Sequence, residues 1–166
     1  MNDDVRWLND EEQDVWREFL SAVSSLSEHL ERRLQADAGM PHTYYEVLVA
    51  LSEAPGMTLR MSELAAKSRF SRSRLSHAVA KLEAKGWVQR GACPTDKRGA
   101  LATLTDEGFT VLKGAAPGHV ESVREALFDV LTAQQVGELG EISRAINGRQ
   151  APIGDAALAE SDPLAC

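Results

Sequence analysis

Residues 62–86 read SELAAKSRFSRSRLSHAVAKLEAKG, and this stretch predicts two helices joined by a tight turn. Ser62 opens a short helical segment ending at Lys67, which is too short to be stable unless it packs against other parts of the chain. Ser71 opens a longer helix that stops at Gly86. The apolar positions of the longer helix are Leu75, Ala78, Val79 and Leu82. The stretch therefore predicts a helix-turn-helix.

A β-hairpin is expected directly after these helices. Residues 87–90 (Trp-Val-Gln-Arg) and 100–104 (Ala-Leu-Ala-Thr-Leu) have the composition of short strands, and Pro94 and Gly99 lie in the polar loop between them. A helix-turn-helix followed by a two-stranded ribbon is a winged helix-turn-helix.

Longer helices flank this unit on both sides. The apolar spacing predicts one long helix over residues 10–39 and a second helix from Thr43, in a capping box, to about Leu51. On the other side a helix begins after Thr105 and is expected to kink or break at Pro117. A capping box at Thr132 opens the last helix.

The predicted fold is mainly α with a small β-hairpin wing, in which a winged helix-turn-helix is flanked by N- and C-terminal helices. Residues 42–104 form the winged helix-turn-helix in this division, and residues 10–39 and 105–147 form the flanking helical region. Residues 148–166 have no apolar periodicity and are expected to form a disordered tail.

Charge separates the winged helix from the rest of the chain. Residues 57–100 hold ten basic and three acidic side chains, a net charge of +7, whereas the whole chain carries −7. A local positive field favours a polyanion such as DNA, because neutralised phosphates release counterions. A solvated charged face is the alternative interpretation of the same pattern.

The start of the second helix holds the residues expected to contact DNA. Arginines there oppose the helix dipole, so stability alone does not explain them. Side chains at this end of such a helix reach base edges in the major groove. The expected DNA-binding residues, including basic neighbours and the hairpin loop, are Arg69, Ser71, Arg72, Ser73, Arg74, Ser76, His77, Lys81, Arg90, Lys97 and Arg98. A solvated helix start with capping serines is the alternative.

Several motifs, in order from about residue 10 to residue 147, resemble the MarR family, the bacterial multiple-antibiotic-resistance regulators. They are Tyr45-Glu-Val-Leu-Val-Ala-Leu, Ser62-Glu-Leu-Ala, Ser73-Arg-Leu-Ser, Lys81-Leu-Glu-Ala-Lys-Gly, Asp96-Lys-Arg-Gly and Leu104-Thr-Asp-Glu-Gly. The pair Asp96-x-Arg-Gly and Leu104-Thr-x-x-Gly at its present spacing carries most of the resemblance.

The resemblance implies a homodimer that binds double-stranded DNA, most often as a repressor. By this resemblance residues 42–104 are the DNA-binding domain, and residues 10–39 and 105–147 are the dimerisation region, whose first and last helices interlace between subunits. A pseudo-palindromic operator would then have half-sites roughly 10 bp apart. By the same resemblance Arg98 enters the minor groove and Asp96 holds the wing in shape. His77 departs from the family pattern, since many relatives carry arginine there.

The resemblance also implies a cleft for a small aromatic or phenolic anion that releases DNA. Tyr44 occupies the place of a tyrosine that lines this cleft in some relatives. Trp16 and His42, with His119, are further candidates for its lining. Ordinary core, interface or capping roles are the alternative for each of these residues.

Other classes of function have less support. The four histidines are scattered, with no nucleophile–base pairing or phosphate loop, so we expect no enzyme and no cofactor. Cys93 and Cys166 have no metal-ligand spacing, and we expect Cys93 to have a structural or incidental role. The chain shows neither a membrane span nor a signal peptide, which favours the cytoplasm. A winged-helix module for protein or RNA binding remains the alternative function.

Overall fold

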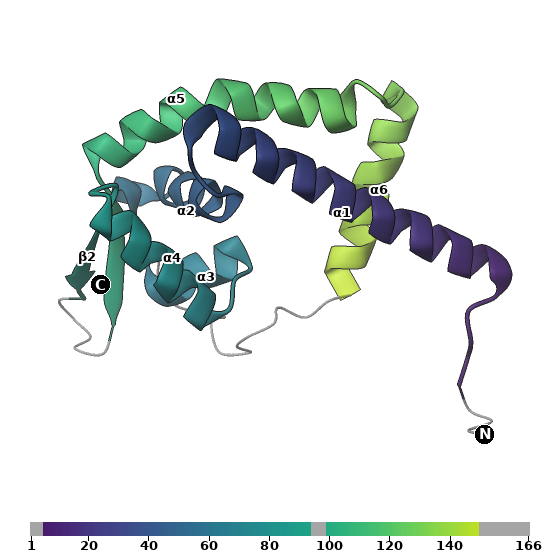
Figure 1. Cartoon of the computed structure of the whole chain (residues 1–166). Coiled ribbons are helices and arrows are strands. Elements are labelled where there is room, and N and C mark those ends of the chain that lie inside the picture. Colours follow the sequence, from purple (N-terminus) through teal and green to yellow (C-terminus); the bar gives the residue numbers. More distant parts are fainter. Residues whose placement is uncertain (1–4, 94–98, 150–166) are drawn as a thin grey trace.

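The computed structural model describes residues 5–93 and 99–149. Two long helices, α1 (Asp10–Ala38) and α5 (Asp106–Val123), run across one side of a smaller lobe (Figure 1). The lobe consists of α2 (His42–Ser52), η1 (Pro55–Met57), β1 (Thr58–Arg60), α3 (Met61–Ser68), α4 (Arg72–Ala84), β2 (Val88–Ala92) and β3 (Ala100–Leu104). After α5 come a π-helix, η2 (Arg124–Phe128), and α6 (Ala133–Arg149).

Local capping sets the ends of the long first helix. Asn9 is its N-cap: the Asn9 side chain accepts from the Glu12 amide at 2.8 Å, and the Glu12 carboxylate accepts from the Asn9 amide at 2.9 Å. The helix therefore begins at Asp10, as the apolar spacing predicted. At the other end Gly39 adopts a left-handed conformation with φ 62°, which ends the helix as expected.

The second helix begins differently from the prediction. Pro41 precedes α2 and makes no side-chain capping bond, so the capping box expected at Thr43 is wrong. The Thr43 hydroxyl instead accepts a hydrogen bond from Arg74 Nη2 on α4 at 2.9 Å. A long-range contact has replaced the local one, which sequence spacing cannot reveal.

The sheet has three strands, in the order β1-β3-β2. The predicted hairpin of β2 and β3 is confirmed, and its pairing extends to a bond from the Cys93 amide to the Gly99 carbonyl at 3.0 Å. The prediction missed β1, which pairs antiparallel with β3 and whose three residues are too few to show an alternating pattern. The Thr58 and Thr103 hydroxyls lie 2.9 Å apart across this pair.

One apolar core joins the lobe to the long helices. α1 contributes Leu34 near its end, α5 contributes Leu112 and the connection between α1 and α2 contributes Met40, while the other buried side chains come from the lobe. The most deeply buried large residues are Met40, Leu48, Leu51, Leu64, Leu75 and Leu82. Burial of these side chains fixes the orientation of α4 relative to the long helices.

The second long helix continues through its proline. α5 is continuous from Asp106 to Val123 with Pro117 inside it, so of the predicted kink or break, the break is wrong. Beyond Val123 the chain forms the π-helical turn of η2, where the Asp129 amide bonds to the Arg124 carbonyl at 2.8 Å. The capping box at Thr132 is confirmed by its reciprocal bonds with Gln135.

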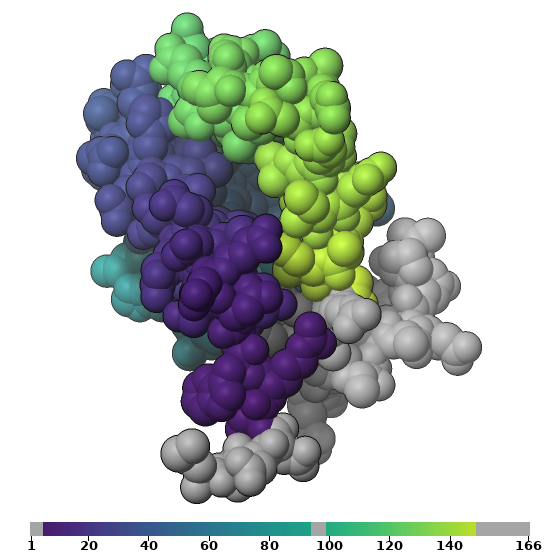
Figure 2. Space-filling model, turned by 90° about the vertical axis from the view of Figure 1, so that its right-hand side faces the viewer, coloured from purple at the N-terminus to yellow at the C-terminus, as the bar shows by residue number. Residues whose placement is uncertain are grey.

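The first half of α1 extends beyond the lobe, beside α6 (Figures 1 and 2). Leu34 is the only buried residue of this helix. Large apolar side chains on the extended part and on the C-terminal elements are exposed to solvent. They are Val15, Trp16, Phe19, Leu20, Val23, Val120, Phe128, Val130, Ile142 and Ile146. A single protomer therefore leaves much of its apolar surface uncovered.

Candidate nucleic-acid interface

A left-handed turn sets the direction of α4. Arg69 ends α3 with φ 53°, a conformation that is uncommon for a residue with a side chain. The Arg69 amide bonds to the Ala66 carbonyl at 3.3 Å, and the Phe70 amide to the Ala65 carbonyl at 3.1 Å. Ser71 then caps α4 as predicted, with its hydroxyl accepting from the Arg74 amide at 3.3 Å.

One side of α4 is apolar and buried, and the other is polar and exposed. Leu75, Ala78, Val79 and Leu82 are buried as expected. The exposed side of the helix holds five of the candidate residues, Arg72, Ser73, Ser76, His77 and Lys81. This face combines positive charge with hydroxyl and imidazole groups, which suits both phosphates and base edges.

Two arginines beside this face contact other parts of the chain. The guanidinium of Arg74 lies 4.4 Å from the Phe70 ring centre and also donates to Thr43. The Arg69 side chain donates from Nη1 to Asn147 Oδ1 on α6 at 3.1 Å. In this conformation both side chains tie elements of the protein together.

Arg90 fixes the first wing strand to α4. Its guanidinium donates from Nε to Glu83 Oε2 at 2.8 Å, and Nη2 lies 2.6 Å from the same oxygen. The hydrogen bond from Arg90 holds the pKa of the Glu83 carboxyl below its ordinary value. Arg90 thus has a positioning contact that its basic character alone did not indicate. The wing-tip candidates Asp96, Lys97 and Arg98 lie outside the described residues.

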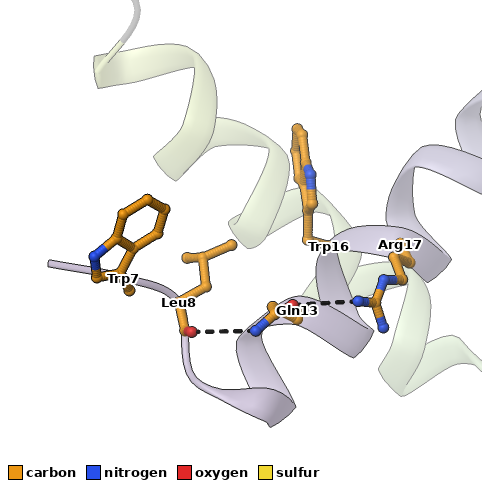
Figure 3. A pocket seen from close by; sticks show the side chains of 5 residues that line it. All are labelled: Trp7, Leu8, Gln13, Trp16 and Arg17. Atoms are coloured by element: carbon orange, nitrogen blue, oxygen red, sulfur yellow. Dashed lines mark hydrogen bonds between the residues drawn. The ribbon is translucent and has the colours of Figure 1, made fainter. Parts of the chain in front are cut away.

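Of the candidates for an effector cleft, His42 and His119 come together, whereas Trp16 of the same protomer lies apart from them. Trp16 lies near the start of α1, where it stacks with Phe19 and faces Trp7 across an open groove of about 390 Å³ (Figure 3). His42 follows the end of α1, so it is on the order of 30 Å from Trp16 along that helix. Tyr44 is half-buried against the core of the lobe.

His42 lies beside one predicted cleft candidate, His119, and beside one residue that was not predicted, Tyr45. Its ring stacks with Tyr45 at 6.4 Å and lies 5.4 Å from the ring of His119 on α5. Sequence spacing overlooked Tyr45, which is one turn along α2 from His42 and mostly buried. One sequence signal could have pointed to Tyr45. It lies three residues after His42 in a mostly apolar helix, and residues at this spacing are neighbours on a helix surface.

Within residues 5–93 and 99–149 no helix has the length and apolarity needed to cross a membrane. The same residues hold no group of three or more histidine, cysteine or acidic side chains placed to bind a metal ion.

Known proteins with this arrangement are transcriptional regulators. The MarR family model matches residues 38–99. Sco3205, a MarR family transcriptional regulator from Streptomyces coelicolor crystallised in complex with DNA, is 56% identical, with a TM-score of 0.86 over 93% of this chain and 97% of that chain. The chain belongs to the MarR family of transcriptional regulators.

Two further similar proteins are also transcriptional regulators. AbsC, a MarR family transcriptional regulator from Streptomyces coelicolor, is 39% identical, with a TM-score of 0.80 over 87% of this chain and 100% of that chain. The transcriptional repressor MprA of Escherichia coli K12 is 25% identical over 126 residues, which are 76% of this chain and 70% of that protein.

The MarR motif Leu104-Thr-x-x-Gly has a structural role in this chain. The Thr105 hydroxyl accepts from the Gly108 amide at 3.0 Å and donates to the Gly86 carbonyl at 2.7 Å. The Thr105 amide also bonds to the Trp87 carbonyl at 3.1 Å. The motif therefore fastens the start of α5 to the turn between α4 and β2. Cys93, at the base of the wing, is only 3% exposed, which agrees with a structural role.

Proposed function

We propose that this MarR family protein is a homodimeric, sequence-specific DNA-binding regulator of transcription. The observation that carries the proposal is the exposed basic face of α4, backed by buried leucines that hold the helix against the core. A helix presented in this way fits the major groove. The complex of the 56% identical Sco3205 with DNA supports the same assignment.

Different residues have different tasks in this proposal. Arg72, Ser73, Ser76, His77 and Lys81 contact bases and phosphates from the outer face of α4. Ser71 contributes by capping the helix. Arg69, Arg74 and Arg90, with their contacts inside the chain, orient the helix and wing while adding to the positive field. In the wing loop, Lys97 meets phosphate, Arg98 enters the minor groove, and Asp96 shapes the loop.

The exposed apolar side chains of the long helices support a homodimer. We assign residues 10–39 and 105–147 to the dimerisation region and residues 42–104 to the DNA-binding domain. Burying the exposed stripe of α1 against a second copy removes apolar surface from water, which is the main favourable contribution to association. Two copies then present two α4 helices to an inverted repeat.

Repression and response to a small aromatic ligand complete the proposal, with a cytoplasmic location where the regulator meets DNA. A repressor role is supported by the relationship to MprA. Tyr44 and His42 lie on α2 at the junction with the long helices. Trp16 of the same protomer is too distant to join them, so it can contribute to a cleft there only from the second copy.

The proposal is tested by selecting bound duplexes from a random DNA pool and titrating the enriched duplex at several salt concentrations. We expect an inverted repeat with half-site centres about 10 bp apart, bound by two subunits. Affinity should fall steeply with salt, because several phosphates are neutralised. Absence of enrichment, with weak binding at low salt only, would favour the alternative of a protein- or RNA-binding module.

A further inference from the structure

Three aromatic side chains meet where α2 packs against α5. His42 is the first residue of α2, Tyr45 is one turn further along, and His119 comes from α5. The Tyr45 and His119 ring centres are 4.3 Å apart, and those of His42 and His119 are 5.4 Å apart. This ring cluster of His42, Tyr45 and His119 joins a long helix to the DNA-binding lobe.

The His119 ring is poorly placed to carry a proton. Its Nδ1 atom is buried and has no hydrogen-bond partner among the described residues. Burial lowers the pKa of His119 below the ordinary value of 6.5, and the nearby His42 lowers this pKa further. Burial also raises the pKa of Tyr45, so the hydroxyl of that residue stays protonated and supplies no negative charge.

The charged groups around the cluster compensate His42 rather than His119. On α1, Glu31 Oε2 accepts from the His42 amide at 2.9 Å, and on α2 a Glu46 oxygen lies 3.8 Å from His42 Nδ1. Acidic side chains therefore lie beside His42, whereas a proton on His119 meets a second imidazole.

Other charged groups on α1 are already paired near the same turn of α5. Arg33 lies 3.7 Å from Asp37, and its Nε donates to the buried Ser122 hydroxyl at 3.4 Å. These contacts hold α1 against α5. Because α1 is held against α5, repulsion between a charged His119 and its neighbours would displace α2, which carries His42 and Tyr45.

We propose that the ring cluster is a proton-sensitive joint, in which acidification charges His119 beside His42 and separates the start of α2 from α5. Because α2 also packs against α3 and α4, opening the joint moves the α4 helix relative to the long helices. The predicted loss of DNA affinity rests on the function proposed above, whereas the opening itself does not.

The sign of the effect follows from the lowered pKa of His119. The unfolded or opened chain binds a proton near the ordinary pKa of 6.5, and the closed joint binds one only at lower pH. The stabilisation of the closed joint is therefore fully present above about pH 6.5. It is lost as the pH falls through the lower pKa of the folded state.

The experiment compares the full-length protein with its His119→Phe variant between pH 8 and pH 5. Phenylalanine keeps a ring against Tyr45 but binds no proton. We expect the wild type to lose at least about tenfold in affinity for the selected duplex on acidification, and the variant to change less than about threefold. The urea midpoint of the free protein should fall with pH more in the wild type than in the variant.

A control histidine and a direct titration complete the test. His29→Gln, on α1 outside the cluster, should retain the wild-type pH dependence. Equal pH dependence in wild type and His119→Phe overturns the proposal, as does an NMR titration midpoint of His119 at or above 6.5 in the wild type.

The NMR titration needs only wild-type protein, so it decides the question even if His119→Phe fails to fold. Absence of DNA binding at every pH would count against the proposed function. In that case the urea midpoints and the NMR titration would still test the joint itself.

Discussion

A Gly108→Ala variant is expected to lose about 3 kcal/mol of unfolding free energy, the upper part of the range for forced overpacking. Gly108 is buried in the first turn of α5. A methyl group built there collides with the Trp87 carbonyl and lies 2.9 Å from Leu104 Cδ1. Neither neighbour can yield easily, because the same carbonyl accepts the Thr105 amide and Leu104 is paired in β3.

The matched control is Gly114→Ala, further along the same helix. A methyl group there meets nothing within 4 Å, so the change should stabilise the protein by about 0.5–1 kcal/mol through helix propensity. Urea denaturation followed by circular dichroism measures both variants. Equal stability of the two would show that the glycine of the MarR motif is not required for close packing.

A Val23→Glu variant is expected to be monomeric at concentrations where the wild type is a dimer. Val23 lies 47% exposed on the stripe of α1 with Trp16, Phe19 and Leu20. A carboxylate buried there by a second copy would have no compensating charge, and twofold symmetry introduces it twice. The dimer dissociation constant should rise at least about a hundredfold, as sedimentation equilibrium can measure.

Ser25→Glu serves as the control for Val23→Glu. Ser25 is exposed and projects on the side of α1 opposite to the apolar stripe. This variant should dimerise like the wild type. If both variants stayed dimeric, the exposed stripe would not be the dimer interface, and the assignment of residues 10–39 to dimerisation would have to be withdrawn.

Local signals predicted most of the helices correctly. Ser71, Thr105 and Thr132 are helix caps in the structure, and Gly39 ends α1, because each depends on contacts within a few residues. The same local signals predicted the order of the elements, apart from β1. The strand β1 escaped notice because only its pairing with β3 makes it a strand.

The sequence was sufficient to predict which side of α4 is exposed. It was not sufficient to predict what each basic side chain near that helix contacts. The buried side of α4 follows from helical periodicity, and the exposed side follows by exclusion. Periodicity cannot show that Arg74 reaches Thr43 or that Arg90 pairs with Glu83, because both contacts depend on tertiary packing. For the same reason Trp16 and His42 could be grouped in sequence although α1 separates them.

The most direct test of the central claim, that the outer face of α4 recognises DNA, is the affinity of Arg72→Ala for the selected duplex. Lys113→Ala on α5 is the matched control, and both variants must first be shown to be folded dimers. Arg72→Ala is expected to weaken binding at least about tenfold, as for loss of a base or phosphate contact, while Lys113→Ala binds like the wild type. Wild-type affinity of Arg72→Ala at moderate salt, or equal losses in both variants, would contradict DNA recognition by this face of α4.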